Sequence, residues 1–209
     1  MNLIESLRWR YATKKFDATK KVSTEDLAVI QEAIQLTATS YGLQLFKVLI
    51  VENKETRAKL QPVSWGQTQI VDASHLLVFC NHKKIEARNI DSFVTLKAKT
   101  QGIAAENLQG YANFMHSKLA EKTPSEIENW TAKQVYIALG NAMAACGELK
   151  IDACPIEGFQ PDQYTEILEL EDKNLQPAVV LAVGYRSAED GTASAPKVRR
   201  SIDELFETV

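Results

Sequence analysis

The amino-acid sequence predicts one domain with an α+β or α/β sandwich fold. Three segments rich in aliphatic and β-branched residues, at 44–51, 75–80 and 178–183, predict buried strands. Segments with apolar residues at helical spacing separate these strands. A chain of 209 residues, 45% of them hydrophobic, is long enough for a sizeable core. No repeat, low-complexity tract or linker divides the sequence, so we expect one domain over residues 1–209.

Helical signals begin near the N-terminus. Apolar residues at helical spacing predict a short helix over residues 2–9. The next helix, over residues 23–36, opens on Ser-Thr-Glu-Asp, where Ser23 or Thr24 could cap an acidic first turn. The small and polar residues 37–42 then predict a loop before the first strand.

The middle of the chain is mostly helical. A helix is predicted over residues 54–60, between the first two strands. The pattern over residues 86–121 is helical and more polar, and indicates two helices broken near Gly102 or Gly110.

A long helix is predicted over residues 130–149, and it is apolar on more than one face. Such a helix is expected to be buried on both sides, which favours a place in a subunit interface. The segment from Ser187 onward has few core signals before Ile202, Leu205 and Phe206. It is typical of an arm that docks elsewhere.

Composition excludes several classes of function. The net charge is -3 and no basic stripe is present, which argues against nucleic-acid binding. No apolar run is long enough to span a bilayer, and charge within the first eight residues argues against a secretory signal. The three cysteines lie in apolar neighbourhoods without ligand spacing. We expect buried structural thiols and a cytoplasmic location.

Several motifs of common enzymes are absent. The dinucleotide-binding glycine motif, the P-loop, the zincin motif and the serine-hydrolase elbow are not found. The histidines His75, His82 and His116 are scattered, so structural or surface roles are favoured over a metal site.

Three short motifs point to a site instead. Residues 10–16 place two cations four residues apart after the first helix, and could grip an anion. Residues 155–159, Pro-Ile-Glu-Gly-Phe, join a proline to a glycine that lets the backbone approach a flat ligand. Residues 196–200 form a basic cluster. Taken singly, each has a simpler interpretation, as surface charge or as a tight loop.

Together, the order and spacing of these motifs resemble the nitroreductase family of FMN-dependent flavoproteins. The resemblance covers nearly the whole chain and includes three further pieces: Asp-Ala-Ser-His at 72–75, Trp-Thr-Ala-Lys-Gln-Val-Tyr at 130–136 and Gly-Asn at 140–141. It implies an α+β sandwich with a mostly antiparallel sheet flanked by helices. It also implies an intertwined homodimer with FMN at the interface, in which the C-terminal arm wraps the partner.

The resemblance also implies roles for individual residues. Arg10, Lys197 and Arg199 would bind the FMN phosphate, and Lys14 would lie near the N1–C2=O edge of the ring. An N–H of Glu157 or Gly158 would face N5, so no side chain is expected as the acid or base, although Lys14 and Glu157 assist. The full set implied at the cofactor is Arg10, Tyr11, Ala12, Lys14, Thr39, Ser40, Gly42, Gly66, Gln69, Pro155, Ile156, Glu157, Gly158, Lys197 and Arg199. Ser40 would come from the other subunit.

The sequence departs from the family pattern at several of these positions. Tyr11 and Ala12 replace a polar pair, Gly42 stands where many relatives have Asn, and Leu45 replaces a common Pro. Gly66 replaces an Asn that meets the flavin, a contact that Gln67 or Gln69 could supply instead.

The implied activity is ping-pong hydride transfer from NADH or NADPH, through FMN, to a small electron-poor acceptor. Nitroaromatics, quinones and pterins are the acceptor classes, and Tyr111 and Phe114 are candidates to line the acceptor pocket. Three alternatives remain open at this stage: a flavin reductase that releases reduced flavin, a flavin-binding sensor or carrier without turnover, and a protein without flavin.

Overall fold

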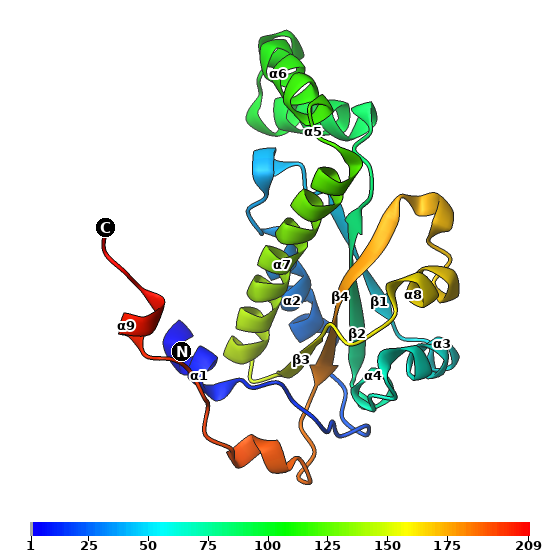
Figure 1. The fold of residues 1–209 in the computed structure, drawn as a ribbon, viewed down its shortest axis with the longest axis vertical. Coiled ribbons are helices and arrows are strands. Elements are labelled where there is room, and N and C mark those ends of the chain that lie inside the picture. The colour runs from blue at the N-terminus through cyan, green and yellow to red at the C-terminus, as the bar shows by residue number, and fades with distance from the viewer. Residues whose placement is uncertain (1) are drawn as a thin grey trace.

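The computed structural model describes residues 2–209 and has a four-stranded sheet in the order β1-β2-β4-β3 (Figure 1). The strands are β1 (Phe46–Val51), β2 (His75–His82), β3 (Asp152–Ile156) and β4 (Leu175–Gly184). Every pairing between these neighbours is antiparallel. The α+β sandwich predicted from the sequence is therefore confirmed.

Helices cover both faces of the sheet. The α-helices are α1 (Leu3–Trp9), α2 (Thr24–Gln35), α3 (Lys54–Leu60), α4 (Gln69–Asp72), α5 (Ala87–Gln101), α6 (Gln109–Ala120), α7 (Pro124–Glu148), α8 (Pro161–Ile167) and α9 (Ile202–Leu205). Short 3-10 turns are η1 (Ser40–Gly42), η2 (Pro62–Ser64), η3 (Ala105–Leu108), η4 (Glu171–Lys173) and η5 (Gly191–Ser194). No helix within residues 2–209 is long and apolar enough to cross a membrane.

The two central strands divide the core by alternation of their side chains. In β2, Leu76 and Val78 pack with α3, α4 and α8, whereas Leu77 and Phe79 pack with α2 and α7. Strand β4 alternates in the same way. Because successive side chains of a strand point to opposite faces, one continuous apolar run builds both layers of the core.

Most elements follow the sequence predictions, with a few corrections. Ser23 caps α2, and the break between α5 and α6 falls at Gly102, which has a left-handed φ of 65°. Gly110 lies inside α6 instead. Helix α7 begins at Pro124 rather than at residue 130, because a capping box of Thr123 and Glu126 starts it earlier.

Strand β3 is a correction to the sequence analysis, which treated its last residues as part of a loop. Pro155 and Ile156 belong to this strand and pair with Leu181 and Val180 of β4. Because β3 is the last strand in the sheet order, a proline without an N–H is tolerated there. Ala12 forms a parallel bridge with Ala153 of β3, so the chain after α1 runs beside this strand.

The three thiols are free and buried, as predicted. Burial raises the pKa of Cys80 and of Cys146 to about 12, so both stay protonated at neutral pH. The C-terminal arm, residues 187–209, has no strand and one short α-helix, α9. Its residues from Thr192 onward are exposed, and it passes beside α1 (Figure 1).

A buried ion pair ties the chain after α1 to the sheet. The Asp152 carboxylate is 4% exposed and accepts hydrogen bonds from the Arg186 backbone N–H at 2.8 Å and from its Nε at 2.9 Å. The Thr13 hydroxyl donates to the same carboxylate at 3.4 Å. The Arg186 guanidinium also lies 4.5 Å from the ring centre of Trp9 and 4.6 Å from that of Tyr11. Asp152 and Arg186 therefore hold residues 9–13 in place.

Asp190 links residues 11–15 to the C-terminal arm through hydrogen bonds. One of its carboxylate oxygens accepts the Tyr11 hydroxyl at 2.9 Å and the backbone N–H groups of Lys14 and Lys15 at 2.8 and 3.2 Å. The other oxygen accepts the N–H and hydroxyl of Thr192 at 3.0 and 2.5 Å. Burial alone would raise the pKa of Asp190, but these hydrogen bonds outweigh it and hold the pKa well below its ordinary value.

We expect Asp152→Ala to lower the free energy of unfolding by about 3 kcal/mol, because it leaves the Arg186 charge and its neighbours without their partner. Urea unfolding at a fixed protein concentration measures this. The matched control is Glu189→Ala, which removes an exposed ion pair with Lys15 and should change stability by less than about 1 kcal/mol. Equal effects of the two variants would contradict the structural role of Asp152.

Asp190→Asn should lower the unfolding free energy by about 1–3 kcal/mol at neutral pH, since an amide nitrogen cannot accept the same hydrogen bonds. The folded-state pKa of Asp190 lies below the unfolded value, so its contribution is present above that value and is lost as the pH falls through the folded pKa. Native protein should therefore lose more stability than the variant between about pH 5 and pH 3. Parallel curves for the two proteins would rule this out.

Candidate active site

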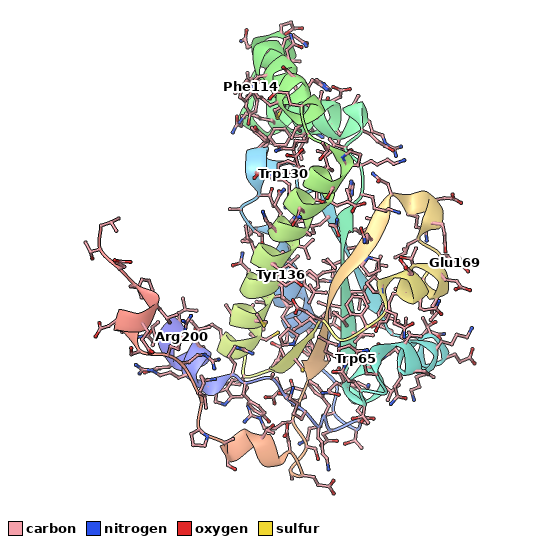
Figure 2. The ribbon with its side chains drawn as sticks, in the orientation of Figure 1. Trp65, Phe114, Trp130, Tyr136, Glu169 and Arg200 are labelled. Carbon is pink, nitrogen blue, oxygen red and sulfur yellow. The ribbon has the colours of Figure 1, made fainter. Side chains whose placement is uncertain are left out.

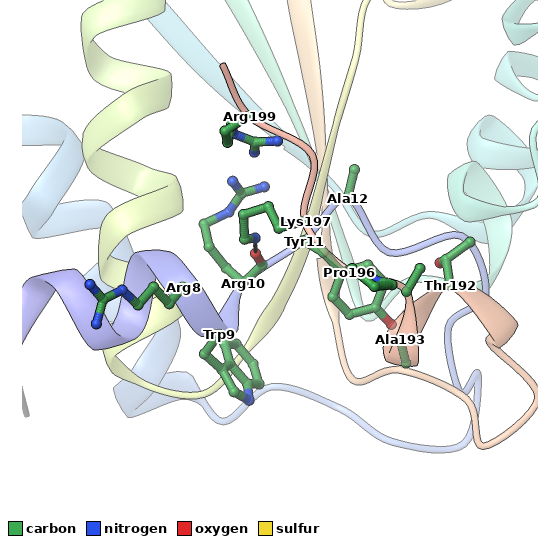
Figure 3. A pocket seen from close by; sticks show the side chains of 11 residues that line it. Arg8, Trp9, Arg10, Tyr11, Ala12, Thr192, Ala193, Pro196, Lys197 and Arg199 are labelled. Carbon is green, nitrogen blue, oxygen red and sulfur yellow. Dashed lines mark hydrogen bonds between the residues drawn. The ribbon is translucent and has the colours of Figure 1, made fainter. Parts of the chain in front are cut away.

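A cationic cavity lies where the two ends of the chain meet. It has a volume of about 370 Å³ and is lined by residues 8–12 and by residues of the arm between Thr192 and Arg199. Figure 3 shows the Arg10 and Arg199 guanidinium groups facing each other, with Lys197 beside them. The Lys197 ammonium donates a hydrogen bond to the Arg10 carbonyl oxygen. The structure thus brings together three cations that are far apart in the sequence.

These three charges have no carboxylate partner. Within residues 2–209, no acidic oxygen lies within 4.0 Å of the nitrogen atoms of Arg10, Lys197 or Arg199 that carry charge. Burial lowers the pKa of Arg10, and the charge of Arg199 lowers it further. Burial and then the charges of Arg10 and Arg199 lower the pKa of Lys197. The arrangement fits a bound anion, and a phosphate dianion suits guanidinium partners well.

The Arg10 side chain also has an unsatisfied hydrogen-bond donor. Its Nε is buried and has no hydrogen-bond partner among the described residues. A buried N–H of a charged group is costly to leave unpaired, and such atoms are rare in folded proteins. An anion held in the cavity would supply the acceptor.

The second motif lies further along β3 from this cavity. Because Ala12 bridges Ala153, the segment of Arg10 to Lys14 runs beside the strand that leads to Glu157 and Gly158. Glu157 lies four residues after Ala153, roughly 13 Å at the rise of a strand, and directly follows the end of β3. The two motifs therefore lie along the same edge of the sheet.

Two side chains hold Glu157 and Gly158 in place. The Tyr136 hydroxyl, from α7, donates to the Glu157 carboxylate at 2.5 Å, and the Gln67 amide donates to the Gly158 carbonyl at 2.8 Å. Burial and then the Glu157 contact raise the pKa of Tyr136 to about 12, so this hydroxyl stays protonated at neutral pH. The Glu157 carboxylate is thereby held by α7.

An aromatic ring lies against Gly158. A Cβ at Gly158 would lie 2.6 Å from two ring carbons of Trp65, so glycine is the residue that fits here with the tryptophan ring in this position. Trp65 has a left-handed φ of 56° and is 76% exposed (Figure 2). The next residue, Gly66, has a φ of 69° and open space where its side chain would be. Gln69 is buried nearby, in α4.

The remaining predicted residues lie at the other end of α7. The Ser40 N–H donates to the Gln134 side chain at 3.1 Å, and the Trp130 indole donates to the Ser40 hydroxyl at 3.2 Å. Phe114 of α6 lies with its ring centre 6.3 Å from that of Tyr41, and Tyr111 packs in the same cluster. Thr39 and Gly42 flank this group in the sequence. These residues form one cluster with the predicted acceptor-pocket residues.

Within one chain, the Ser40 cluster and the cationic cavity are far apart. Trp130 contacts Ser40, while Gly147 packs against Ser6 of α1, near the cationic cavity. Gly147 lies 17 residues after Trp130, which corresponds to about 26 Å of helix. Figure 1 shows α1 and α6 at opposite ends of α7.

Several residues that shape the site were not predicted from the sequence. Asp152, Asp190 and Arg186 join segments that are distant in the chain, and no local pattern marks them. Trp65 and Tyr136 were also missed as neighbours of Gly158 and Glu157. Among the described residues, no group of three His, Cys, Asp or Glu side chains is arranged to hold a metal ion.

Comparisons with known proteins identify the family. The sequence model of the nitroreductase family matches residues 7–185. The major NAD(P)H-flavin oxidoreductase of Aliivibrio fischeri is 32% identical over 211 residues, which cover 98% of this chain and 97% of that protein.

Solved structures share the fold. The nitroreductase family protein of Streptococcus pneumoniae superposes with a TM-score of 0.85 at 22% identity, covering 100% of both chains. A protein of Exiguobacterium sibiricum, solved in complex with FMN, has a TM-score of 0.85 at 20% identity and covers 100% of this chain and 98% of that one. The match of the family model over most of the chain, together with the full-length relative, shows that the chain belongs to the nitroreductase family.

Proposed function

We propose that the protein is an FMN-dependent oxidoreductase that passes hydride from NADH or NADPH to a small electron-poor acceptor, such as a nitroaromatic, a quinone or a pterin. The observation that carries the proposal is the cavity in which Arg10, Lys197 and Arg199 converge without a carboxylate. The name of the Aliivibrio fischeri relative and the FMN complex of the Exiguobacterium sibiricum protein support the choice of cofactor.

The residues of the two motifs fit the two ends of FMN. The three cations and the unpaired Nε of Arg10 suit its phosphate. Near Gly158, the exposed ring of Trp65 and the backbone that follows β3 are the features that we assign to the flat ring of the flavin. When bound, FMN supplies hydride acceptance and return at its N5 atom.

The chain's own residues provide geometry and charge for that chemistry. Lys14, on the segment held by Asp190, is the cation that we assign to the electron-accepting end of the ring. Tyr136 and Gln67 hold Glu157 and Gly158, which orients the backbone at the end of β3. No side chain has to act as acid or base, because the cofactor carries the reaction.

We further propose that two copies of the chain form the working enzyme. The Ser40 cluster lies about 26 Å along α7 from the cationic cavity, and we infer that a partner chain supplies it to the cofactor. Apolar residues that a partner could cover are exposed on α1, α2, α7 and the arm: Leu3, Ile4, Leu7, Val29, Leu36, Ile137, Val198, Ile202, Leu205 and Phe206. A two-fold dimer would then hold two equivalent sites.

The second candidate function is a flavin reductase that releases reduced flavin, which the name of the Aliivibrio fischeri relative favours. A flavin reductase would use the same site, but its acceptor would be free flavin rather than a nitroaromatic, a quinone or a pterin. The free, buried thiols support a reducing compartment such as the cytoplasm for either function.

An absorbance spectrum of the purified protein tests the function directly. We expect a flavin spectrum that bleaches under anaerobic addition of NADH or NADPH and returns on addition of an acceptor. Rates with nitrofurazone, menadione, a quinonoid pterin and free FMN then rank the acceptors, and free FMN as the fastest would favour the flavin reductase. A flavin that neither nicotinamide bleaches would contradict both activities and leave a carrier or sensor.

Arg10→Ala and Arg199→Ala should each weaken FMN binding about 10- to 100-fold, because each removes a charged donor to the phosphate. Fluorescence titration of the apoprotein with FMN measures the dissociation constant, and urea unfolding checks that the fold is intact. Arg200→Ala is the matched control, because Arg200 neighbours the cavity in sequence without lining it. Unchanged FMN affinity in both test variants would remove the phosphate assignment.

A further inference from the structure

A second cavity lies away from the candidate active site. Its volume is about 630 Å³, larger than that of the cationic cavity at Arg10. It is lined by Ala18, Lys21 and Val22, by the start of α3 and by the junction of α4 with β2. None of the residues proposed to hold FMN lines it. Figure 1 shows α3 and α4 on the opposite side of the molecule from α1 and the arm.

A buried guanidinium forms the back of this cavity. Arg57 is 3% exposed, and its nitrogens donate to the carbonyl oxygens of Ile70, Ala73 and Ser74 at 2.6, 2.6 and 3.3 Å. These carbonyls satisfy hydrogen bonds but do not neutralise the charge. Burial lowers the pKa of Arg57, and the charge of Asp72, which does not line the cavity, opposes that effect. Within residues 2–209, no carboxylate oxygen lies within 4.0 Å of the Arg57 guanidinium.

Two lysines add to this positive charge. Lys21 and Lys54 line the same cavity from opposite segments of the chain. Burial lowers the pKa of Lys21, and the charges of Arg57 and Lys54 lower it further, which shows that the three cations act on one another. Glu52 is the acidic residue among those that line the cavity, so three cations against one carboxylate leave a charge of +2.

The neutral polar side chains that line the cavity, Ser74 and His75, are held by hydrogen bonds. The Val22 N–H donates to the Ser74 hydroxyl at 2.8 Å, and that hydroxyl lies 3.0 Å from Nδ1 of His75. Nε2 of His75 lies 3.4 Å from the Glu52 carboxylate. Burial lowers the pKa of His75, and Lys21 and Arg57 lower it further against the opposing effect of Glu52, so the imidazole is neutral at pH 7. These contacts engage Ser74, His75 and Glu52 with one another. Lys21 and Lys54 are therefore the cavity's exposed cations.

We propose that this cavity is a second ligand site, which binds a small phosphate monoester between Lys21 and Lys54 in front of Arg57. A phosphate dianion matches the charge of +2 and is well suited to lysine and arginine donors. The cavity falls in the size range of small-molecule sites, so it has room for an organic group in addition to the phosphate. Free phosphate shares the charged part of this chemistry, and the experiment below separates the two.

Calorimetric titration of the FMN-saturated protein with glycerol 3-phosphate tests the proposal, because bound FMN removes the cationic cavity at Arg10 from the measurement. The test variant is Lys21→Gln/Lys54→Gln. The matched control is Lys20→Gln/Lys59→Gln, which removes two lysines of the same segments that do not line the cavity. Both test lysines are exposed, so the fold should persist, and the flavin spectrum and circular dichroism verify this.

We expect the test variant to bind glycerol 3-phosphate roughly tenfold or more weakly than native protein, and the control to bind it as native protein does. Inorganic phosphate should bind to the native protein more weakly than glycerol 3-phosphate. Equal affinity of native protein and test variant, or no binding by native protein, would overturn the site. Tighter binding of inorganic phosphate would overturn the assignment to a monoester. FMN binding is measured separately, so failure here leaves the proposed oxidoreductase untouched.

Discussion

The candidate active site depends on three positive charges that the fold holds close together. Arg10, Lys197 and Arg199 repel one another, yet they face one cavity from both ends of the chain. The carboxylate of Asp190 makes this possible by accepting hydrogen bonds from both segments, at Tyr11, Lys14 and Lys15 on one side and Thr192 on the other. Asp190 serves as a tie rather than as a counterion, because its oxygens are already occupied. The three cations are thereby held in position to bind an anion. Their mutual repulsion lowers the stability of the fold when no anion is bound.

Local features of this fold could be predicted from the sequence because local interactions determine them. Ser23 caps α2 and Gly102 ends α5 with a left-handed backbone, both of which follow from residue type and spacing. The strands with continuous apolar runs were also predictable, since both of their faces are buried. The resemblance to a family added the set of candidate site residues, which periodicity alone could not provide.

What could not be predicted depends on contacts between distant segments. Asp190 lies 176 residues from Lys14, and Asp152 lies 139 from Thr13, so neither carboxylate has a local signal. Strand β3 is short and contains Asp and Pro, which are both depleted in strands. Its place at the end of the sheet order and the bridge from Ala12 make it a strand, and these are tertiary facts. The polar first turns of α7 carry no apolar period, although Thr123 and Glu126 form a capping box.

The length of α7 has a consequence for how folding, assembly and cofactor binding are related. The helix holds the Ser40 cluster near one end and the α1 segment near the other, about 26 Å apart. Under the proposed function, one chain offers the phosphate cavity and the Gly158 surface, and its partner offers Ser40, Tyr111 and Phe114. A cofactor that contacts both chains stabilises the dimer as well as each fold, because it binds only the assembled state. The repulsion among Arg10, Lys197 and Arg199 strengthens this relation, since the anion that relieves it is part of the same cofactor.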